Sequence, residues 1–230
     1  MSITISAFLG KRTDDLEARF INAFSSLGFD VQLHPELTLT SSPEGGVLYL
    51  RITKTPPAFL RLEPTTPLLT AFEFGVQKRG KKEPRSMQWP PRGVGVYSYV
   101  ASSRTAAGRS DCAAAMQIIS MAILAKESDG YFHADGEEVA SPGELALNLA
   151  MQGQDRFSRI NFDAYAYRFE SWPPVDGVPS FVWPKKIVPP ASLAQQVPRR
   201  RFRFRYKFSW FHVPSILLSS YFIFLILRYS

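Results

Sequence analysis

The stretch "SDCAAAMQIISMAILAKESDG", residues 110–130, predicts a helix whose centre is apolar nearly all round. Ser110 or Asp111 is placed to cap its first turn, and Asp129-Gly130 to end it. A helix without a polar face is normally buried on every side. We therefore expect this helix to pack against a sheet that the rest of the chain supplies.

A second helix is predicted from "TDDLEARFINAFSSLG", residues 13–28. Thr13 is the expected N-cap and Gly28 the expected residue just past the C-terminus. Apolar residues recur at helical spacing between them. The stripe consists of Leu16, Phe20, Ala23, Phe24 and Leu27. Strand-like sequences at 2–9 and 29–34 flank this helix, so the chain opens with a strand–helix–strand unit.

The middle of the chain is rich in β-branched and aromatic residues and is interrupted by prolines. Strands are predicted at 46–53, 58–63, 68–77 and 94–101. A hairpin with Asp135-Gly136 in its turn follows the buried helix. A third helix is expected to begin with Ser141 as N-cap, Pro142 at the first position and Glu144 completing a capping box. Residues 163–172 alternate again and predict a closing strand.

These elements predict an α+β fold with a mostly antiparallel sheet and about three helices packed on it. The globular domain is expected to span residues 1–172. Seven prolines between 173 and 198 favour an extended linker there. A basic collar at 199–207 and an apolar, transmembrane helix at 208–227 complete the predicted organisation.

The net charge of +7 is carried entirely by the last 33 residues. Residues 198–230 hold seven Lys or Arg and no acid, so residues 1–197 hold 20 basic (27 − 7) and 20 acidic side chains. A neutral domain argues against a nucleic-acid-binding role based on overall charge. The single cysteine, Cys112, excludes an intrachain disulfide and favours a reducing compartment.

The C-terminal tail joins the basic run "RRRFRFRYKF" to an apolar run. Residues 208–227 contain no Asp, Glu, Lys or Arg, and a helix of this length spans about 30 Å, the thickness of the bilayer core. Cations collect on the cytoplasmic side of such a helix, so the domain is expected at the inner face of a membrane. The predicted interface residues are Arg199, Arg200, Arg201, Arg203, Arg205, Lys207 and Trp210.

Three other interpretations of the tail stay open at this point. Its alternating cations and aromatics also suit a two-faced strand of a soluble fold. The same pattern suits stacking on single-stranded nucleic acid. The abrupt change in composition is also what read-through or a truncated gene would produce.

A basic loop, residues 78–92, is the best candidate for binding a partner. Cations beside a tryptophan and paired prolines suit an acidic protein partner or a phosphate. The predicted binding residues are Lys78, Arg79, Lys81, Lys82, Arg85, Trp89 and Arg92. Arg104 and Arg109, just before the buried helix, are a second candidate for holding an anion.

No sequence motif indicates catalysis or metal binding. Cys112 lies at a helix N-terminus, where a thiol pKa is often lowered, but alanine neighbours favour a buried structural role. His133, Asp135, Glu137 and Glu138 form a cluster of potential metal ligands that the predicted turn would break. We expect no metal and no cofactor, and the sequence leans against an enzyme.

The segment "ILAKESDGYFHADGEEVASPGELA", residues 123–146, follows the alanine-rich helix. With the elements before it, over about residues 1–170, it resembles small bacterial α+β proteins of unknown function, including immunity-protein-like domains of toxin systems. The resemblance implies a cytosolic binding protein without catalysis. The predicted function is therefore a non-catalytic protein-binding module, an immunity-like inhibitor tethered to the cytoplasmic membrane face, whose partner is a protein such as a toxin. The alternatives are an enzyme using Cys112 or the His133 hairpin, and a nucleic-acid binder using the tail.

Overall fold

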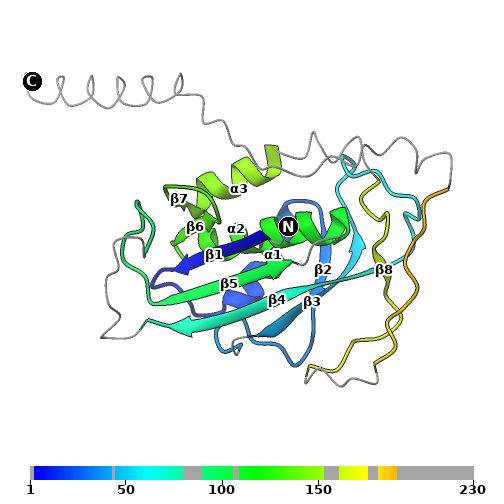
Figure 1. Ribbon diagram of the computed structural model, residues 1–230, viewed down its shortest axis with the longest axis horizontal. Coiled ribbons are helices and arrows are strands. Elements are labelled where there is room, and N and C mark those ends of the chain that lie inside the picture. Colours follow the sequence, from blue (N-terminus) through cyan, green and yellow to red (C-terminus); the bar gives the residue numbers. More distant parts are fainter. Residues whose placement is uncertain are drawn as a thin grey trace, which may run out of the picture. The chain divides into compact units, whose positions relative to one another are not determined.

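The chain forms an α+β domain in which three helices pack on an antiparallel sheet (Figure 1). The computed structural model describes residues 3–42, 45–79, 90–105, 109–152, 161–175 and 181–190. The predicted collar and transmembrane helix lie outside these residues. In the described part of the chain, no helix has the length and apolar character needed to cross a membrane. The elements are β1 (Ile3–Leu9), α1 (Leu16–Ser26), β2 (Asp30–Leu33), β3 (Gly46–Lys54), β4 (Leu68–Lys78), β5 (Tyr99–Thr105), α2 (Asp111–Glu127), β6 (Tyr131–Ala134), β7 (Ser141–Pro142), α3 (Gly143–Gln152) and β8 (Tyr167–Arg168).

The strand order in the sheet is β2-β3-β4-β5-β1-β6-β7, with every pair antiparallel. The predicted opening unit is present, but β1 and β2 run in the same direction with three other strands between them. Strand β4 is longer than its neighbour β5. It pairs with β5 from Glu73 to Lys78 and with the short strand β8 at Leu68 and Leu69.

Helix α2 is buried over most of its length, from Cys112 to Ala125, as its sequence predicts. The Ser110 hydroxyl caps it by accepting a hydrogen bond of 3.2 Å from the Ala113 amide. Gln117, a polar residue in its middle, satisfies its amide group within the sheet. It donates to the Ile3 carbonyl (3.2 Å) and accepts from the Thr105 hydroxyl (2.8 Å).

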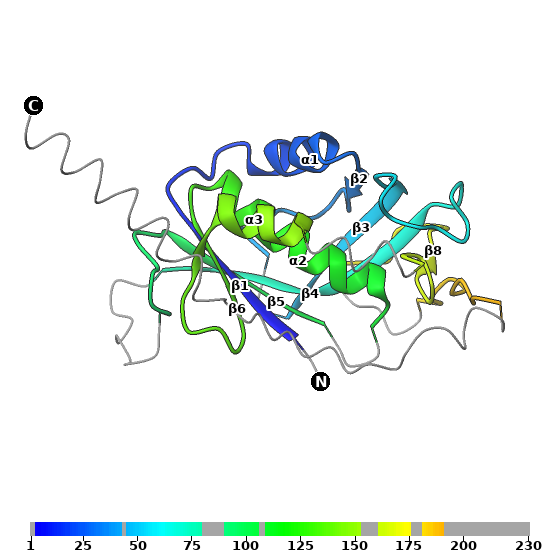
Figure 2. The same ribbon diagram turned by 90° about the horizontal axis from the view of Figure 1, so that it is seen from above.

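The helices cover one face of the sheet (Figure 2). Alternate side chains of the strands point toward them. The main core contains Ile5, Ala7 and Leu9 of β1, Leu48, Leu50 and Ile52 of β3, and Leu68, Phe72 and Phe74 of β4. The opposite face carries none of the helices, and we call it the open face. Phe8 points to the open face, where it packs with Tyr97 and Val100 in a small separate cluster.

Helix α1 buries Leu16, Phe20 and Phe24, three members of its predicted stripe. It begins two residues later than predicted, because Asp15 adopts a left-handed conformation (φ 52°) in front of Leu16 and no side chain caps the first turn. Gly28 has φ 86° just beyond the last turn, which confirms its predicted role.

Helix α3 does not use the predicted capping box. Ser141 and Pro142 instead pair with Phe132 and Tyr131 as strand β7, so the helix begins at Gly143. The turn predicted at Asp135-Gly136 is present, but the strand that returns from it lies at 141–142 and not within 137–140. A Cβ on Gly143 would overlap the backbone of Ala125 and Lys126 in α2. Only a glycine therefore allows α3 to start this close to α2.

The predicted strand at 58–63 is absent because its amides bind a side chain. Leu62 and Glu63 donate backbone hydrogen bonds of 2.8 and 2.9 Å to the carboxylate of Asp163. Asp163 also accepts from Nε of Arg61 at 3.1 Å, and both side chains are at most 5% exposed. The closing strand predicted at 163–172 is also shorter, because Ala164 and Ala166 donate their amides to the Asn161 and Asp163 carbonyls in a turn, and only Tyr167–Arg168 joins the sheet. Strand β5 runs from Tyr99 to Thr105, later than the predicted 94–101.

Residues 161–175 and 181–190 form a segment that we call the strap. It holds all of the described residues of the predicted linker, and it packs onto the domain beyond Trp172. Tyr165 donates its amide to the Ile187 carbonyl (2.8 Å), and Ile187 donates to Ala166 (2.9 Å). Ile187 is 1% exposed. Prolines have no N–H, so only the other residues of the strap can donate backbone hydrogen bonds. These few bonds are enough to attach the extended chain to the core.

Replacing Asp163 with Asn should destabilise the domain by about 3–5 kcal/mol, because it leaves the buried Arg61 guanidinium without a counter-charge. Guanidinium unfolding followed by circular dichroism measures this loss. Glu144→Gln is the matched control, since Glu144 pairs with Lys126 (3.1 Å) on an exposed surface and should cost about 1 kcal/mol or less. Equal effects of the two substitutions would contradict the buried role of Asp163.

Candidate functional site

The predicted basic loop begins and ends beside the sheet. Lys78 is the last residue of β4, and the Arg79 guanidinium lies over the Tyr97 ring, 4.6 Å from its centroid. The Arg92 carbonyl accepts a hydrogen bond from the Ala140 amide (2.8 Å), while its side chain is exposed. Lys81, Lys82, Arg85 and Trp89 lie outside the described residues, and so do all the predicted membrane-interface residues. The Arg79 end of the loop therefore lies beside the Phe8, Tyr97 and Val100 cluster of the open face.

The open face is hollowed along β4. Alternate β4 residues from Leu69 to Gln77 point to this face, and two of them, Ala71 and Gly75, are small. Neighbouring strands add small residues, since Gly75 is opposite Ser102 of β5 and Ser102 is opposite Ser6 of β1. Small side chains between larger ones leave a depression in the sheet surface.

Two cavities of about 350 and 360 Å³ lie along this depression, and Glu73 and Arg104 line both. Each is large enough for a small ligand or a few residues of an extended peptide. We call the combined depression the groove. Its lining on the open face and strap includes Thr4, Val47, Tyr49, Leu69, Ala71, Glu73, Gly75, Gln77, Ser102, Arg104, Arg109, Tyr165, Tyr167, Trp183 and Lys186. The cavity at the Leu69 end also reaches past the end of β5 to the helix-covered side, where Thr70, Phe72, Thr105, Ser110 and Ala113 line it.

Aromatic rings form the wall at the Leu69 end of the groove. The Trp183 ring lies 4.9 Å from the Tyr167 ring and 6.3 Å from the Tyr49 ring, centroid to centroid. Trp183 is nevertheless 42% exposed. Nζ of Lys186 lies 4.8 Å from the centroid of Tyr167. At the Gln77 end, the cluster of Phe8, Tyr97 and Val100 forms the other boundary.

Tyr165, another lining residue, has a left-handed backbone (φ 60°) and a side chain that is 48% exposed. This conformation is unfavourable for a bulky residue, by about 1–2 kcal/mol. The hydrogen bond from its amide to Ile187 and the turn formed by Asp163 and Ala166 hold it in place. Strained residues of this kind concentrate at binding sites.

Three cations and one carboxylate line the cavity at the aromatic end of the groove: Arg104, Arg109, Lys186 and Glu73. Glu73 and Arg104 are register partners on β4 and β5, so their side chains share the open face. Burial lowers the pKa of Arg109, and the nearby Asp111 partly opposes this change. A bound anion would stabilise the charged form of this partly desolvated guanidinium.

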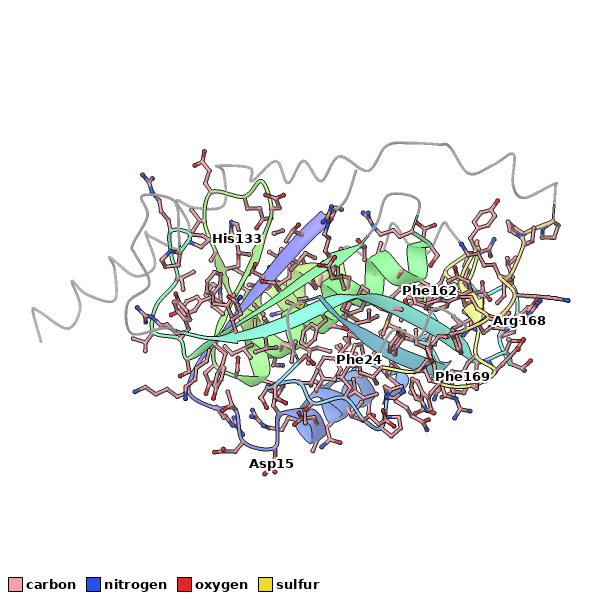
Figure 3. All side chains as sticks on the ribbon, turned by 60° about the horizontal axis from the view of Figure 1, so that its bottom comes forward. Asp15, Phe24, His133, Phe162, Arg168 and Phe169 are labelled. Carbon is pink, nitrogen blue, oxygen red and sulfur yellow. The ribbon has the colours of Figure 1, made fainter. Side chains whose placement is uncertain are left out.

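The other predicted candidates do not form a site. Cys112 is fully buried, and burial raises the pKa of its thiol. His133 uses Nε2 in a 2.9 Å contact with the Glu137 carbonyl oxygen, and His34 contacts the Pro173 carbonyl oxygen in the same way (2.9 Å). No group of three or more His, Cys, Asp or Glu side chains is arranged to hold a metal within the ranges that the structure describes. Figure 3 shows His133 at one end of the sheet and Phe162, Arg168 and Phe169 at the other.

The sequence interpretation identified part of the groove. Arg104 and Arg109 were singled out as anion-binding candidates, and both line it, although Arg104 belongs to β5 and not to a loop before the helix. Glu73 and Trp183 were missed. Glu73 could have been found from the alternating pattern of β4, which places it on the outward face. Trp183 could not, because its packing depends on long-range contacts.

Cys112 should resist alkylation by iodoacetamide at neutral pH in the folded protein, because its raised pKa leaves almost no reactive thiolate. Mass spectrometry of the native chain and of the same chain in guanidinium measures the difference. Complete labelling only after unfolding is expected. Rapid labelling of the native thiol would instead support the alternative of an enzyme that uses Cys112.

Comparisons with known proteins identify no relative of this chain. No protein-family model matches it. No curated protein and no solved structure matches it either. The groove is therefore identified as a candidate site from the geometry of its residues alone.

Proposed function

We propose that this protein is a non-catalytic protein-binding module, an immunity-like inhibitor held at the cytoplasmic face of a membrane. The observation that carries the proposal is the groove, in which exposed aromatic and basic side chains surround a depression in the open face. Tryptophan, tyrosine and arginine dominate the binding energy of protein interfaces. All three residue types line this groove.

The site suits a protein partner better than a small substrate. Outward β4 positions from Leu69 to Gln77 extend over eight residue steps, or about 27 Å at the rise of a β-strand. A surface of this length matches an extended protein segment. The predicted basic loop begins at Lys78, the last residue of β4, immediately past the groove.

The membrane attachment rests on the sequence of the tail. Six cations at 199–207 precede 20 residues without Asp, Glu, Lys or Arg. Such a collar is attracted to anionic lipids by about 1 kcal/mol for each cation near the surface. The attachment would concentrate the binding module where a toxin crosses or reaches the membrane.

A photo-crosslinking residue at Ser102, on the floor of the groove, should capture a discrete partner protein in cells that contain it. Ser102 is exposed and lies between Gly75 and Ser6 in the sheet. The same residue placed at Asn22, exposed on α1, is the matched control. Capture at both positions or at neither would contradict the proposal that the groove is the partner-binding surface.

Membrane fractionation tests the attachment separately. Full-length protein should sediment with membranes and dissolve in detergent. It should also resist extraction by 1 M salt, because about 20 inserted apolar residues hold it in the bilayer independently of charge. Release by salt alone would show that the collar binds lipid without an inserted helix. Recovery of the full-length chain in the soluble fraction would contradict the attachment altogether.

A further inference from the structure

The charged and the aromatic residues of the groove lie at different, defined positions along β4. Arg104 lies opposite Glu73, and Tyr167 lies opposite Leu69, so the two positions are four residues apart on the same strand. This separation is about 13 Å at the rise of a β-strand. In a partner segment lying along β4, one side chain would contact the guanidinium of Arg104, and another, about four residues away, would contact the aromatic wall.

Cations outnumber acids around the groove. Arg104, Arg109 and Lys186 line it, and Arg79 lies beyond the Gln77 end against the Tyr97 ring. Glu73 is the carboxylate among the described lining residues. The domain as a whole is neutral, because residues 1–197 carry 20 basic and 20 acidic side chains. The positive charge is therefore a local property of this surface, which favours an acidic ligand.

Apolar surface gathers at the aromatic end. Trp183 and Tyr165 of the strap are about half exposed, and both line the cavity at this end. Exposed rings beside cations suit a ligand that carries a ring or an aliphatic side chain together with negative charge. A ligand with charge alone would leave this apolar surface in water.

A nucleic acid fits this arrangement less well than a protein segment. Every nucleotide of a strand carries a phosphate, so a strand lying along the groove would bring phosphates past the carboxylate of Glu73. A protein segment has negative charges only at certain positions. It can therefore place an uncharged or donor group beside Glu73 and a carboxylate beside Arg104.

We infer that the groove binds an extended acidic segment of a partner protein, with a carboxylate at Arg104 and an aromatic or aliphatic side chain, about four residues away, against Trp183 and Tyr167. This inference rests on the proposed protein-binding function and adds the chemistry of the partner. Its geometry follows from the register of β4 with β5 and β8.

Fluorescence anisotropy with the full-length chain in detergent micelles tests the inference. The probe is a labelled decapeptide of glycine and serine that contains one tryptophan and, four positions away, one glutamate, made in both chain directions. Arg104→Gln and Trp183→Ala should each weaken binding about tenfold, the effect of losing one important contact. Glu73→Gln should strengthen it, because it removes the opposing charge. Lys54→Gln, an exposed change on β3 outside the groove lining, is the matched control and should have no effect.

The competing occupants each give a distinct result. The basic tail also attracts acidic peptides, so binding that survives Arg104→Gln and Trp183→Ala would overturn the inference. Equal binding of a peptide with lysine in place of glutamate, or tighter binding of a ten-nucleotide oligothymidylate through the same residues, would overturn it as well. If the Ser102 crosslink succeeds and these peptides fail, the protein-binding function stands and only the partner chemistry is wrong. Circular dichroism of each variant confirms that it is folded.

Discussion

The buried carboxylate of Asp163 is the interaction on which the candidate site depends. It binds the Arg61 guanidinium and two backbone amides, and so it joins the turn at 61–63 to the strap. Both charges are removed from water, and their hydrogen bonds offset that cost. The strap carries Tyr165, Tyr167 and Trp183, so this carboxylate helps to position the aromatic wall of the groove, together with the Arg168–Glu63 ion pair and the pairing of β8 with β4.

The groove also depends on the one-sided arrangement of the helices. An apolar helix such as α2 gains most by packing fully against one sheet face, with α1 and α3 beside it. Among the described residues, the strap and the Phe8 cluster pack on the other face. Between these two boundaries the small residues Ala71, Gly75 and Ser102 leave β4 accessible.

The sequence predicted the elements whose stability is local or periodic. Helix α2 and strands β3 and β4 were predicted because their apolar patterns match what they bury. The strand predicted at 58–63 failed because the side chain of Asp163, about 100 positions away, binds the amides that a ladder would use. The site could not be predicted in full for a related reason. Arg104 and Arg109 are recognisable in the sequence as cations before a helix. Their association with Trp183 depends on how the strap packs, which the local sequence does not indicate.

Hydrogen exchange in wild type and in Asp163→Asn, under conditions where local opening dominates, tests this account most directly. The account predicts much faster exchange for the amides of Tyr165, Arg168 and Ile187, which bond within the strap. Exchange of β1 and β5 amides should stay near the wild-type rate. Unchanged exchange of the strap amides would show that Asp163 does not hold the wall of the groove.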